Sequence, residues 1–251
     1  MNLENKIVVV TGAASGIGLG LVARFIAEGA TVIASDLATS LGRERAGALG
    51  ARFVAADVSR ESEIEALVKN VLADEGRIDL FCSNAGIGTR MDGLSGDDAW
   101  DRIIDINFRS QVWAARHVLP DMLERGEGYL LNTASAAGLL TELDSIGYAS
   151  TKHASVGFSE WLAFTYRDRG VRVSVLCPEG VRTPMADQAP YLLHNAIGVQ
   201  EVAETVVGAL REERFMITTH ETTLERFRSK AADYEGYIAF LAARRGQVLG
   251  S

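Results

Sequence analysis

The sequence predicts an α/β protein with a doubly wound, parallel seven-stranded sheet, helices on both faces and a single domain. Short apolar runs typical of buried strands alternate with helix-length patterns along the chain. A glycine-rich turn follows the first run, and with only 4 prolines no linker divides the pattern. The predicted strands are residues 6–10, 31–35, 52–56, 78–83, 128–133, 171–176 and 214–218.

Composition limits the class of protein. Of the 251 residues, 47% are hydrophobic and 23% are charged, which is typical of a globular domain spanning 1–251. The net charge of −8 argues against a nucleic-acid partner, because phosphate binding needs a basic face. No apolar run approaches the ~18 residues of a membrane span, and the first strand begins near residue 5, which leaves no room for a signal peptide. We therefore expect a cytoplasmic protein that has no membrane partner.

The first predicted strand opens into a turn with three spaced glycines. Gly12 permits a tight turn, Gly16 lets the backbone approach a pyrophosphate, and Gly18 lets the helix pack closely on the strand. The amides at the start of that helix point toward bound phosphates. Asp36 ends the second predicted strand, where an acid binds the ribose of a dinucleotide. Together these residues predict a dinucleotide site.

Tyr148 and Lys152 lie four positions apart in the helical pattern before the sixth strand. Positions i and i+4 share one helix face, so the ammonium can lie beside the phenol and favour its anion. We expect the pKa of Tyr148 to move from about 10 toward working pH, where the phenol exchanges a proton with an alcohol or ketone.

These motifs resemble the classical short-chain dehydrogenase/reductase family from about residue 5 to about residue 220. Residues 11–18 match its Thr-Gly-x-x-x-Gly-x-Gly turn. The resemblance implies a Rossmann fold and a nicotinamide cofactor. Further family motifs stand in the expected order: Asp57-Val58, Asn84-Ala85-Gly86, Asn107, Ser135, Tyr148 and Lys152.

The resemblance also implies a role for each catalytic residue. Tyr148 would be the general acid/base, and Lys152 would hold the nicotinamide ribose and lower the pKa of that tyrosine. Ser135 would hydrogen-bond the substrate oxygen, or else act as a helix or turn cap. Asn107 would anchor the water of a proton relay. The expected cofactor-binding residues are Gly12, Ser15, Gly16, Ile17, Gly18, Asp36, Leu37, Asp57, Val58, Asn84, Ala85, Gly86, Tyr148, Lys152, Val181 and Thr183.

The ribose-binding acid predicts NAD rather than NADP. The Asp36 carboxylate would accept hydrogen bonds from the ribose hydroxyls and would repel a 2′-phosphate. Residues that could neutralise that phosphate are missing, because position 37 is Leu37 and the turn from Gly12 to Gly16 contains no Arg or Lys.

One position departs from the family pattern. After the sixth strand the family has Pro-Gly, whereas this chain has Pro178-Glu179, which puts the backbone geometry at Glu179 in doubt. The Glu179 side chain would either bind a substrate hydroxyl or amine, or form a salt bridge with a neighbour such as Arg182.

The substrate is less well specified than the reaction. A substrate loop around 179–198 and the loop before Tyr148 would form a largely apolar pocket for a secondary alcohol or ketone of modest size. A sugar or an acyl-carrier substrate remains open. The expected substrate-binding residues are Ser135, Leu140, Tyr148, Glu179, Met185 and Tyr191.

The C-terminal segment 221–249 is predicted to be mostly helical, and it would serve either for packing or subunit contact or as a lid over the substrate.

A catalytically weak, NAD-binding redox sensor or scaffold is the alternative function, although it would need no proton donor. Cys82 and Cys177 end apolar runs and read as reduced core residues. We expect no metal, because the histidines lack ligand spacing.

The resemblance predicts a homotetramer, or failing that a dimer, through the helices around 100–118 and 148–168. Trp113 and Trp161 fall in these helices and would lie in the core or the interface. Sedimentation at micromolar concentration measures the assembly, and a monomer would contradict the prediction.

Overall fold

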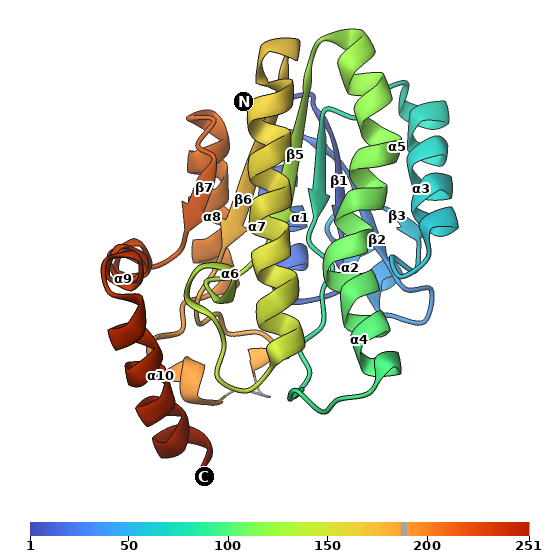
Figure 1. Ribbon diagram of the computed structural model, residues 1–251. Helices are drawn as coiled ribbons and strands as arrows, with labels where there is room; N and C mark the ends of the chain where they lie inside the picture. The colour runs from blue at the N-terminus through green and yellow to red at the C-terminus, as the bar shows by residue number, and fades with distance from the viewer. Residues whose placement is uncertain (187–189, 251) are drawn as a thin grey trace.

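The computed structural model describes residues 1–186 and 190–250, so 187–189 of the predicted substrate loop lie outside the described residues. Seven strands form one parallel sheet in the order β3-β2-β1-β4-β5-β6-β7 (Figure 1). The predicted fold class is confirmed. The strands are β1 (Ile7–Thr11), β2 (Thr31–Asp36), β3 (Arg52–Ala55), β4 (Leu80–Ser83), β5 (Gly128–Thr133), β6 (Val171–Cys177) and β7 (Met216–Thr218).

The strands form where the apolar runs predict them, with ends that move by one or two residues. All of β1 and β5 is buried, because helices cover both faces of the sheet. In the central strand, Val8 pairs with Val32 of β2 on one side and Leu80 of β4 on the other. Cys82 and Cys177 are free and buried, as the sequence predicts.

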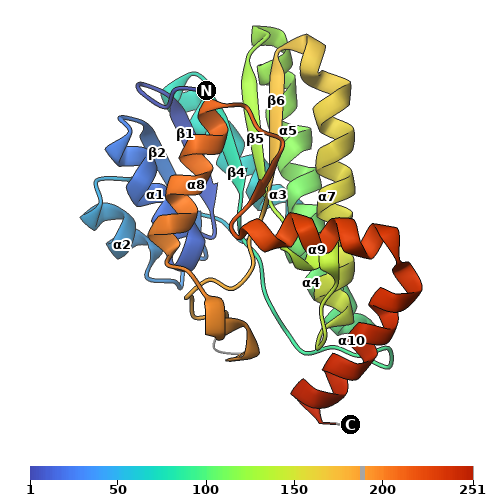
Figure 2. The ribbon, with the colours of Figure 1, turned by 90° about the vertical axis from the view of Figure 1, so that its left-hand side faces the viewer.

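Two helical layers enclose the sheet (Figure 2). One layer consists of α1 (Gly16–Ala27), α2 (Gly42–Ala48) and α8 (Val199–Arg211), and the other of α3 (Glu61–Glu75), α5 (Ser110–Arg125) and α7 (Ile146–Tyr166). The chain changes layer between β3 and β4, so the helices after β1 and β4 diverge. Such a switch point leaves a crevice beyond the carboxyl ends of the strands. The shorter elements are α4 (Asp97–Ile104), η1 (Asp105–Arg109), α6 (Ala137–Leu140), η2 (Arg167–Arg169) and η4 (Pro190–Asn195).

The C-terminal segment is two helices, α9 (Glu221–Ala232) and α10 (Tyr234–Leu249), rather than one. The break falls at Asp233, whose carboxylate caps α10 by accepting a hydrogen bond from Gly236 N at 2.9 Å. Lys230 Nζ donates to the carbonyl of Leu139, and the Tyr237 hydroxyl donates to that of Leu140, both at 2.7 Å. The segment therefore packs on α6 of its own chain.

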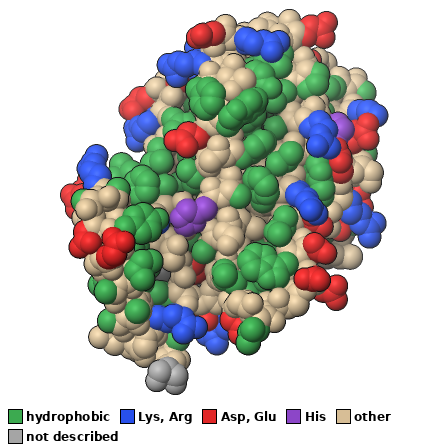
Figure 3. All heavy atoms as spheres, viewed as in Figure 1, with side chains coloured by type: hydrophobic (Ala, Val, Ile, Leu, Met, Phe, Trp, Pro, Cys, Tyr) green, Lys and Arg blue, Asp and Glu red, His purple; other side chains and the backbone are tan. Residues whose placement is uncertain are grey.

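An aromatic patch lies on the outer face of α7. Trp161 is 50% exposed and Phe164 is 70% exposed, and their rings pack edge to face. Figure 3 shows hydrophobic side chains gathered over the face that α5 and α7 form. Trp113, by contrast, packs against the core beneath. Within the described residues, no helix is long and apolar enough to cross a membrane.

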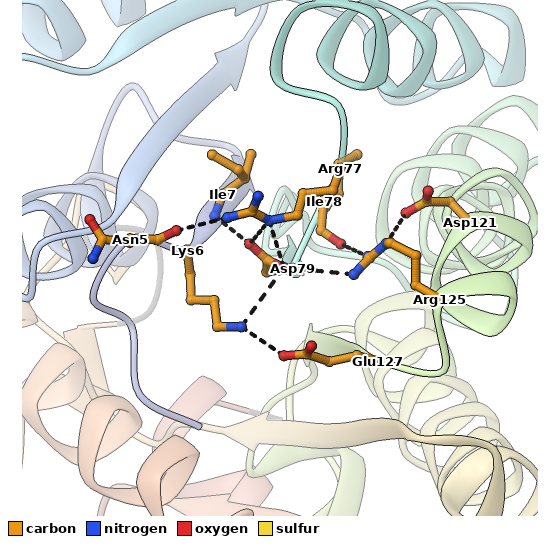
Figure 4. A network of polar contacts seen from close by, with 9 residues as sticks. All are labelled: Asn5, Lys6, Ile7, Arg77, Ile78, Asp79, Asp121, Arg125 and Glu127. Atoms are coloured by element: carbon orange, nitrogen blue, oxygen red, sulfur yellow. Dashed lines mark hydrogen bonds and ion pairs between the residues drawn. The ribbon is translucent and has the colours of Figure 1, made fainter.

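A buried carboxylate ties together the amino ends of the central strands (Figure 4). Asp79 is 2% exposed, and its side chain accepts a hydrogen bond from Ile7 N at 2.8 Å. Arg77 Nε lies 3.0 Å from the carboxylate, Arg125 Nη1 3.7 Å and Lys6 Nζ 4.0 Å. These cations offset the cost of burying the charge.

Removing this carboxylate should therefore destabilise the whole sheet. We expect Asp79→Ala to lower the free energy of unfolding by about 3 kcal/mol, because it leaves the Ile7 amide and nearby cations without their partner. Urea unfolding at pH 7 measures the change. Glu127→Ala is the control, since Glu127 is 62% exposed and its pair with Lys6 should contribute under about 1 kcal/mol. Equal losses in the two variants would contradict the prediction.

Candidate active site

The residues singled out by the sequence gather beyond the carboxyl ends of the strands, at the lower edge of the sheet in Figure 1. Thr11 ends β1 and Asp36 ends β2, while Asn84 follows β4. Ser135 and Pro178 follow β5 and β6. Because all seven strands are parallel, distant parts of the chain supply one site.

The turn after β1 fits glycine and little else. Gly12 and Gly16 have positive φ angles of 66° and 52°. A Cβ on Gly12 would lie 2.8 Å from Ala85 Cα, and one on Gly18 would lie 2.1 Å from the carbonyl oxygen of Gly12. Ser15 begins α1, yet its hydroxyl makes no capping hydrogen bond within the described chain. The turn is thus a backbone cradle with open donors, which fits a pyrophosphate.

Thr11 and Asn84 lock this turn to the neighbouring strand. Thr11 Oγ1 accepts hydrogen bonds from the amides of Asn84 at 3.0 Å and Ala85 at 3.2 Å, and donates to the carbonyl of Cys82 at 3.3 Å. Asn84 Nδ2 donates in return to the Thr11 carbonyl at 3.0 Å. The Asn84-Ala85-Gly86 motif therefore braces the cradle from β4.

Asp36 lies directly beside the glycine turn. Its carboxylate accepts hydrogen bonds from Ala14 N at 2.9 Å and Leu37 N at 2.8 Å. Arg45 Nη1 of α2 donates to the Ala14 carbonyl at 2.6 Å. Sequence reasoning missed this arginine, because only the folding of α2 against the turn brings it there. Position 37 and the turn itself contain no cation, as the sequence shows, and Arg45 approaches the turn from outside it.

Two further predicted cofactor residues border the crevice on the β3 side. Asp57 Oδ1 accepts hydrogen bonds from the amide and hydroxyl of Ser59, at 3.0 and 2.7 Å, which fixes the loop after β3. Val58 is buried at that loop.

Asn107 lies in η1, one turn of π-helix, and is fully buried. Its side chain accepts a hydrogen bond from Ile87 N at 2.8 Å and donates to the Ile87 carbonyl at 2.9 Å. Single π turns often occur at functional sites. The amide is thus committed to the loop after β4, and the carbonyl oxygen of Asn107, 3.4 Å from Ser155 Oγ, faces α7.

Ser135 and Tyr148 face the same cavity from two elements. Ser135 Oγ accepts a hydrogen bond from Ala137 N at 3.1 Å, so the capping role considered for it is present. Tyr148 lies in the first turn of α7, where its amide donates to the Ser145 hydroxyl at 3.2 Å. The N-cap of α7 therefore fixes the position of the tyrosine.

Burial controls protonation at Tyr148 and Lys152. It raises the pKa of Tyr148 to about 12, against the opposing effect of a hydrogen bond with Ser135. It lowers the pKa of Lys152 to about 8. Lys152 Nζ donates to the Thr133 carbonyl at 2.9 Å and lies 5.4 Å from the centre of the Tyr148 ring. The expected lowering of the tyrosine pKa is therefore wrong, because the loss of water raises the pKa more than the hydrogen bond with Ser135 lowers it.

One cavity connects the glycine turn to Tyr148. Ile17 of the turn lines it, and so do Val181 and Thr183 of the segment after β6. All six residues expected to bind substrate line the same cavity. These are Ser135, Leu140, Tyr148, Glu179, Met185 and Tyr191. Sequence reasoning missed Arg90 and Arg226, which also line it and which no motif marks.

Glu179 has an ordinary backbone conformation, since its φ is not in the left-handed region. Its carboxylate accepts hydrogen bonds from Thr223 Oγ1 at 2.8 Å and from Arg226 Nη1 at 2.5 Å. The predicted neighbour, Arg182, lies instead 3.7 Å from Glu201. The salt bridge is therefore present with a different partner, because α9 folds back over the segment after β6.

No group of three or more metal-ligating side chains occurs within 1–186 and 190–250. What the site brings together is a glycine turn that fits a pyrophosphate, a carboxylate at the end of β2 and a phenol beside a lysine. This set can bind a dinucleotide and exchange a proton with a substrate oxygen.

Known proteins with similar sequences and structures carry the same kind of activity in their names. A curated relative, 1-deoxy-11-beta-hydroxypentalenate dehydrogenase from Streptomyces exfoliatus, is 35% identical, over 95% of this chain and 92% of the relative. 3beta-hydroxysteroid dehydrogenase 2 from Eggerthella lenta is 34% identical, over 72% of this chain and 73% of that protein's length.

A solved structure, a short chain dehydrogenase/reductase from Burkholderia phymatum in complex with NAD, superposes with a TM-score of 0.88. It is 28% identical, and the match covers 94% of this chain and 96% of that one. The family model for short chain dehydrogenases matches residues 6–191. With this match and the cradle, acid and phenol in place, the chain belongs to the short-chain dehydrogenase family.

Proposed function

We propose that the protein is an NAD-dependent oxidoreductase that transfers a hydride between nicotinamide and a secondary alcohol or ketone of modest size and largely apolar character. The observation that carries the proposal is the single cavity shared by Ile17 of the glycine turn and by Ser135 and Tyr148. A nucleotide seated on the turn would reach the two hydroxyls that meet the substrate oxygen.

The chain's own residues provide the binding of the cofactor. The turn from Gly12 to Gly18 would hold the pyrophosphate, and Asp36 the adenosine ribose. Lys152 would hold the second ribose, as supported by its place beside Gly86, where an added Cβ would lie 3.6 Å from its Nζ. Bound NAD supplies the hydride acceptor in alcohol oxidation, and NADH the donor in ketone reduction.

Tyr148 would exchange the proton that accompanies the hydride. With its pKa raised to about 12, the phenol is protonated at neutral pH and can donate to a carbonyl oxygen. Ser135 would hold that oxygen in reach. In the opposite direction the phenolate must accept the alcohol proton, so oxidation should become faster as pH rises.

The cavity supports a substrate of largely apolar character. Leu140, Met185 and Tyr191 form apolar walls around the two hydroxyls. Two of the relatives are named as dehydrogenases of a hydroxypentalenate and of a 3beta-hydroxysteroid. We propose a compact polycyclic secondary alcohol for this chain.

Assembly and location remain proposals as well. The exposed Trp161 and Phe164 on α7 support a homotetramer or dimer in which this face is covered. We also propose a cytoplasmic location, where the cofactor would be supplied.

Removing the phenolic proton tests the reaction. Tyr148→Phe should retain nucleotide binding and lower kcat at least a hundredfold, because only the hydroxyl is removed. Turnover of a panel of cyclic alcohols and ketones with both nicotinamides measures activity, and calorimetry measures binding. Near-normal kcat in the variant would refute the role of Tyr148. Wild-type nucleotide binding with no turnover of any compound would favour a redox sensor instead.

Burial of Lys152 makes a prediction for stability against pH. In the unfolded chain its pKa is near 10.4, whereas folding lowers it to about 8. Between these values the unfolded state binds more protons, so folding becomes more favourable as pH rises. Wild type should therefore gain up to about 3 kcal/mol relative to Lys152→Met from pH 7 to pH 10.5. Urea unfolding across this range measures the gap, with Lys69→Met, which removes a 72% exposed lysine, as control. A constant gap would contradict the prediction.

Cofactor choice has a separate test. Wild type should prefer NAD by about a hundredfold in kcat/KM, because Asp36 would repel the 2′-phosphate of NADP. Asp36→Ala with Leu37→Arg should shift the preference toward NADP, since it exchanges a repelling carboxylate for a cation. Arg45→Met should weaken both cofactors alike if this arginine only holds the turn. A wild-type preference for NADP would show that Asp36 does not bind the ribose.

A further inference from the structure

We infer that Arg226 of α9 is a specificity-determining residue that donates a hydrogen bond to a second, uncharged oxygen of the substrate, such as a carbonyl remote from the reacting carbon. This inference rests on the proposed oxidoreductase function and specifies its substrate class. Arg226 belongs to the C-terminal segment, yet it lines the cavity that also holds Ser135 and Tyr148.

Glu179 orients the arginine rather than meeting the substrate itself. The Glu179 side chain is 13% exposed, and each of its oxygens already accepts a hydrogen bond, one from fully buried Thr223 and one from Arg226. These two contacts hold the carboxylate against α9, with each oxygen directed at a donor of that helix. Together with Tyr237, which also contacts the guanidinium, it fixes the position of a long side chain.

Arg226 can donate hydrogen bonds to a ligand, whereas the Glu179 carboxylate can only accept them. A guanidinium carries five N–H donors; Glu179 uses one at Nη1, and the Tyr237 hydroxyl engages another. The side chain is 46% exposed at the wall of the cavity, so its remaining donors can reach a ligand. Because arginine has no acceptor, the group it binds must be an acceptor oxygen.

The charge of the cavity indicates that this oxygen is neutral. Arg90 Nε pairs with Asp144 at 2.7 Å, as Arg226 does with Glu179. Glu142 has a tyrosine hydroxyl as its partner. Among the described lining residues, three carboxylates and two guanidiniums therefore leave a formal charge of −1. A carboxylate on the substrate would meet net repulsion, whereas a carbonyl would not.

The test compares two matched fused-ring substrates in the oxidation direction. One is a decalinol, and the other is the hydroxydecalone with one additional carbonyl on the second ring. Wild type should favour the hydroxydecalone at least tenfold in kcat/KM, mainly through KM, because the added bond also forms in the ground state. Arg226→Leu should lose most of this preference. Arg228→Leu, on the same helix but outside the cavity lining, should retain it.

A second variant guards against misfolding. Glu179→Gln with Arg226→Met removes both charges together, so no buried carboxylate is left unpaired, and it should lose the preference as well. An unchanged preference in either Arg226 variant would overturn the inference. So would equal losses for the two substrates, which would indicate a purely structural role.

Two measurements separate this inference from the proposed function. A hydroxydecalin carboxylate preferred over the hydroxydecalone would overturn the neutral subsite. If wild type oxidises neither alcohol, calorimetric binding of the hydroxydecalone still tests Arg226: tenfold weaker binding in Arg226→Leu supports the subsite, while equal or absent binding overturns it. In that case the oxidoreductase proposal fails separately from the binding subsite.

Discussion

The close approach of two backbones at the switch point is the constraint on which the site depends. The glycine turn lies so near the loop after β4 that a Cβ on Gly12 would overlap the backbone of Ala85, and a Cβ on Gly18 would overlap the Gly12 carbonyl and crowd the Asn84 side chain. Thr11 and Asn84 hold the two segments at this separation through hydrogen bonds to each other's main chain. Because β1 and β4 are adjacent, the cradle and the loop that Asn107 braces form one rigid unit. The tyrosine and serine are then positioned relative to that unit by β5 and α7.

Burial, more than charge pairing, sets the electrostatics of the site. Burial shifts both Tyr148 and Lys152 toward their neutral forms, since the hydrogen bonds with Ser135 and the Thr133 carbonyl replace only part of the lost water. At the opposite end of the sheet, the buried Asp79 carboxylate forms ion pairs with three cations. The fold thus concentrates paired charge where it stabilises strands, and leaves poorly solvated groups where proton exchange is proposed.

Much of this arrangement could be predicted from the sequence, because local patterns determine it. Apolar runs located all seven strands, and spaced glycines located the turn, since each pattern reflects a backbone requirement at its own position. Arg45 and Arg226 could not be found this way, because helix packing alone brings them to the site from α2 and α9. The pKa of Tyr148 was misjudged for a related reason: the i+4 spacing predicts proximity to Lys152, but it contains no measure of desolvation.

The C-terminal helices α9 and α10 belong to a part of the chain that lies outside the family match, and α9 borders the cavity. The residues matched by the family model stop at 191, whereas α9 and α10 come later and press on α6, behind the cavity wall. The glycine turn and one part of the cavity wall are thus encoded in separate stretches of sequence. Among the described lining residues, Arg226 is the one that comes from this segment, so a substitution there would alter the cavity wall far from the glycine turn in the sequence. An engineer could therefore vary the α9–α10 segment while the part of the chain that carries the glycine turn stays constant.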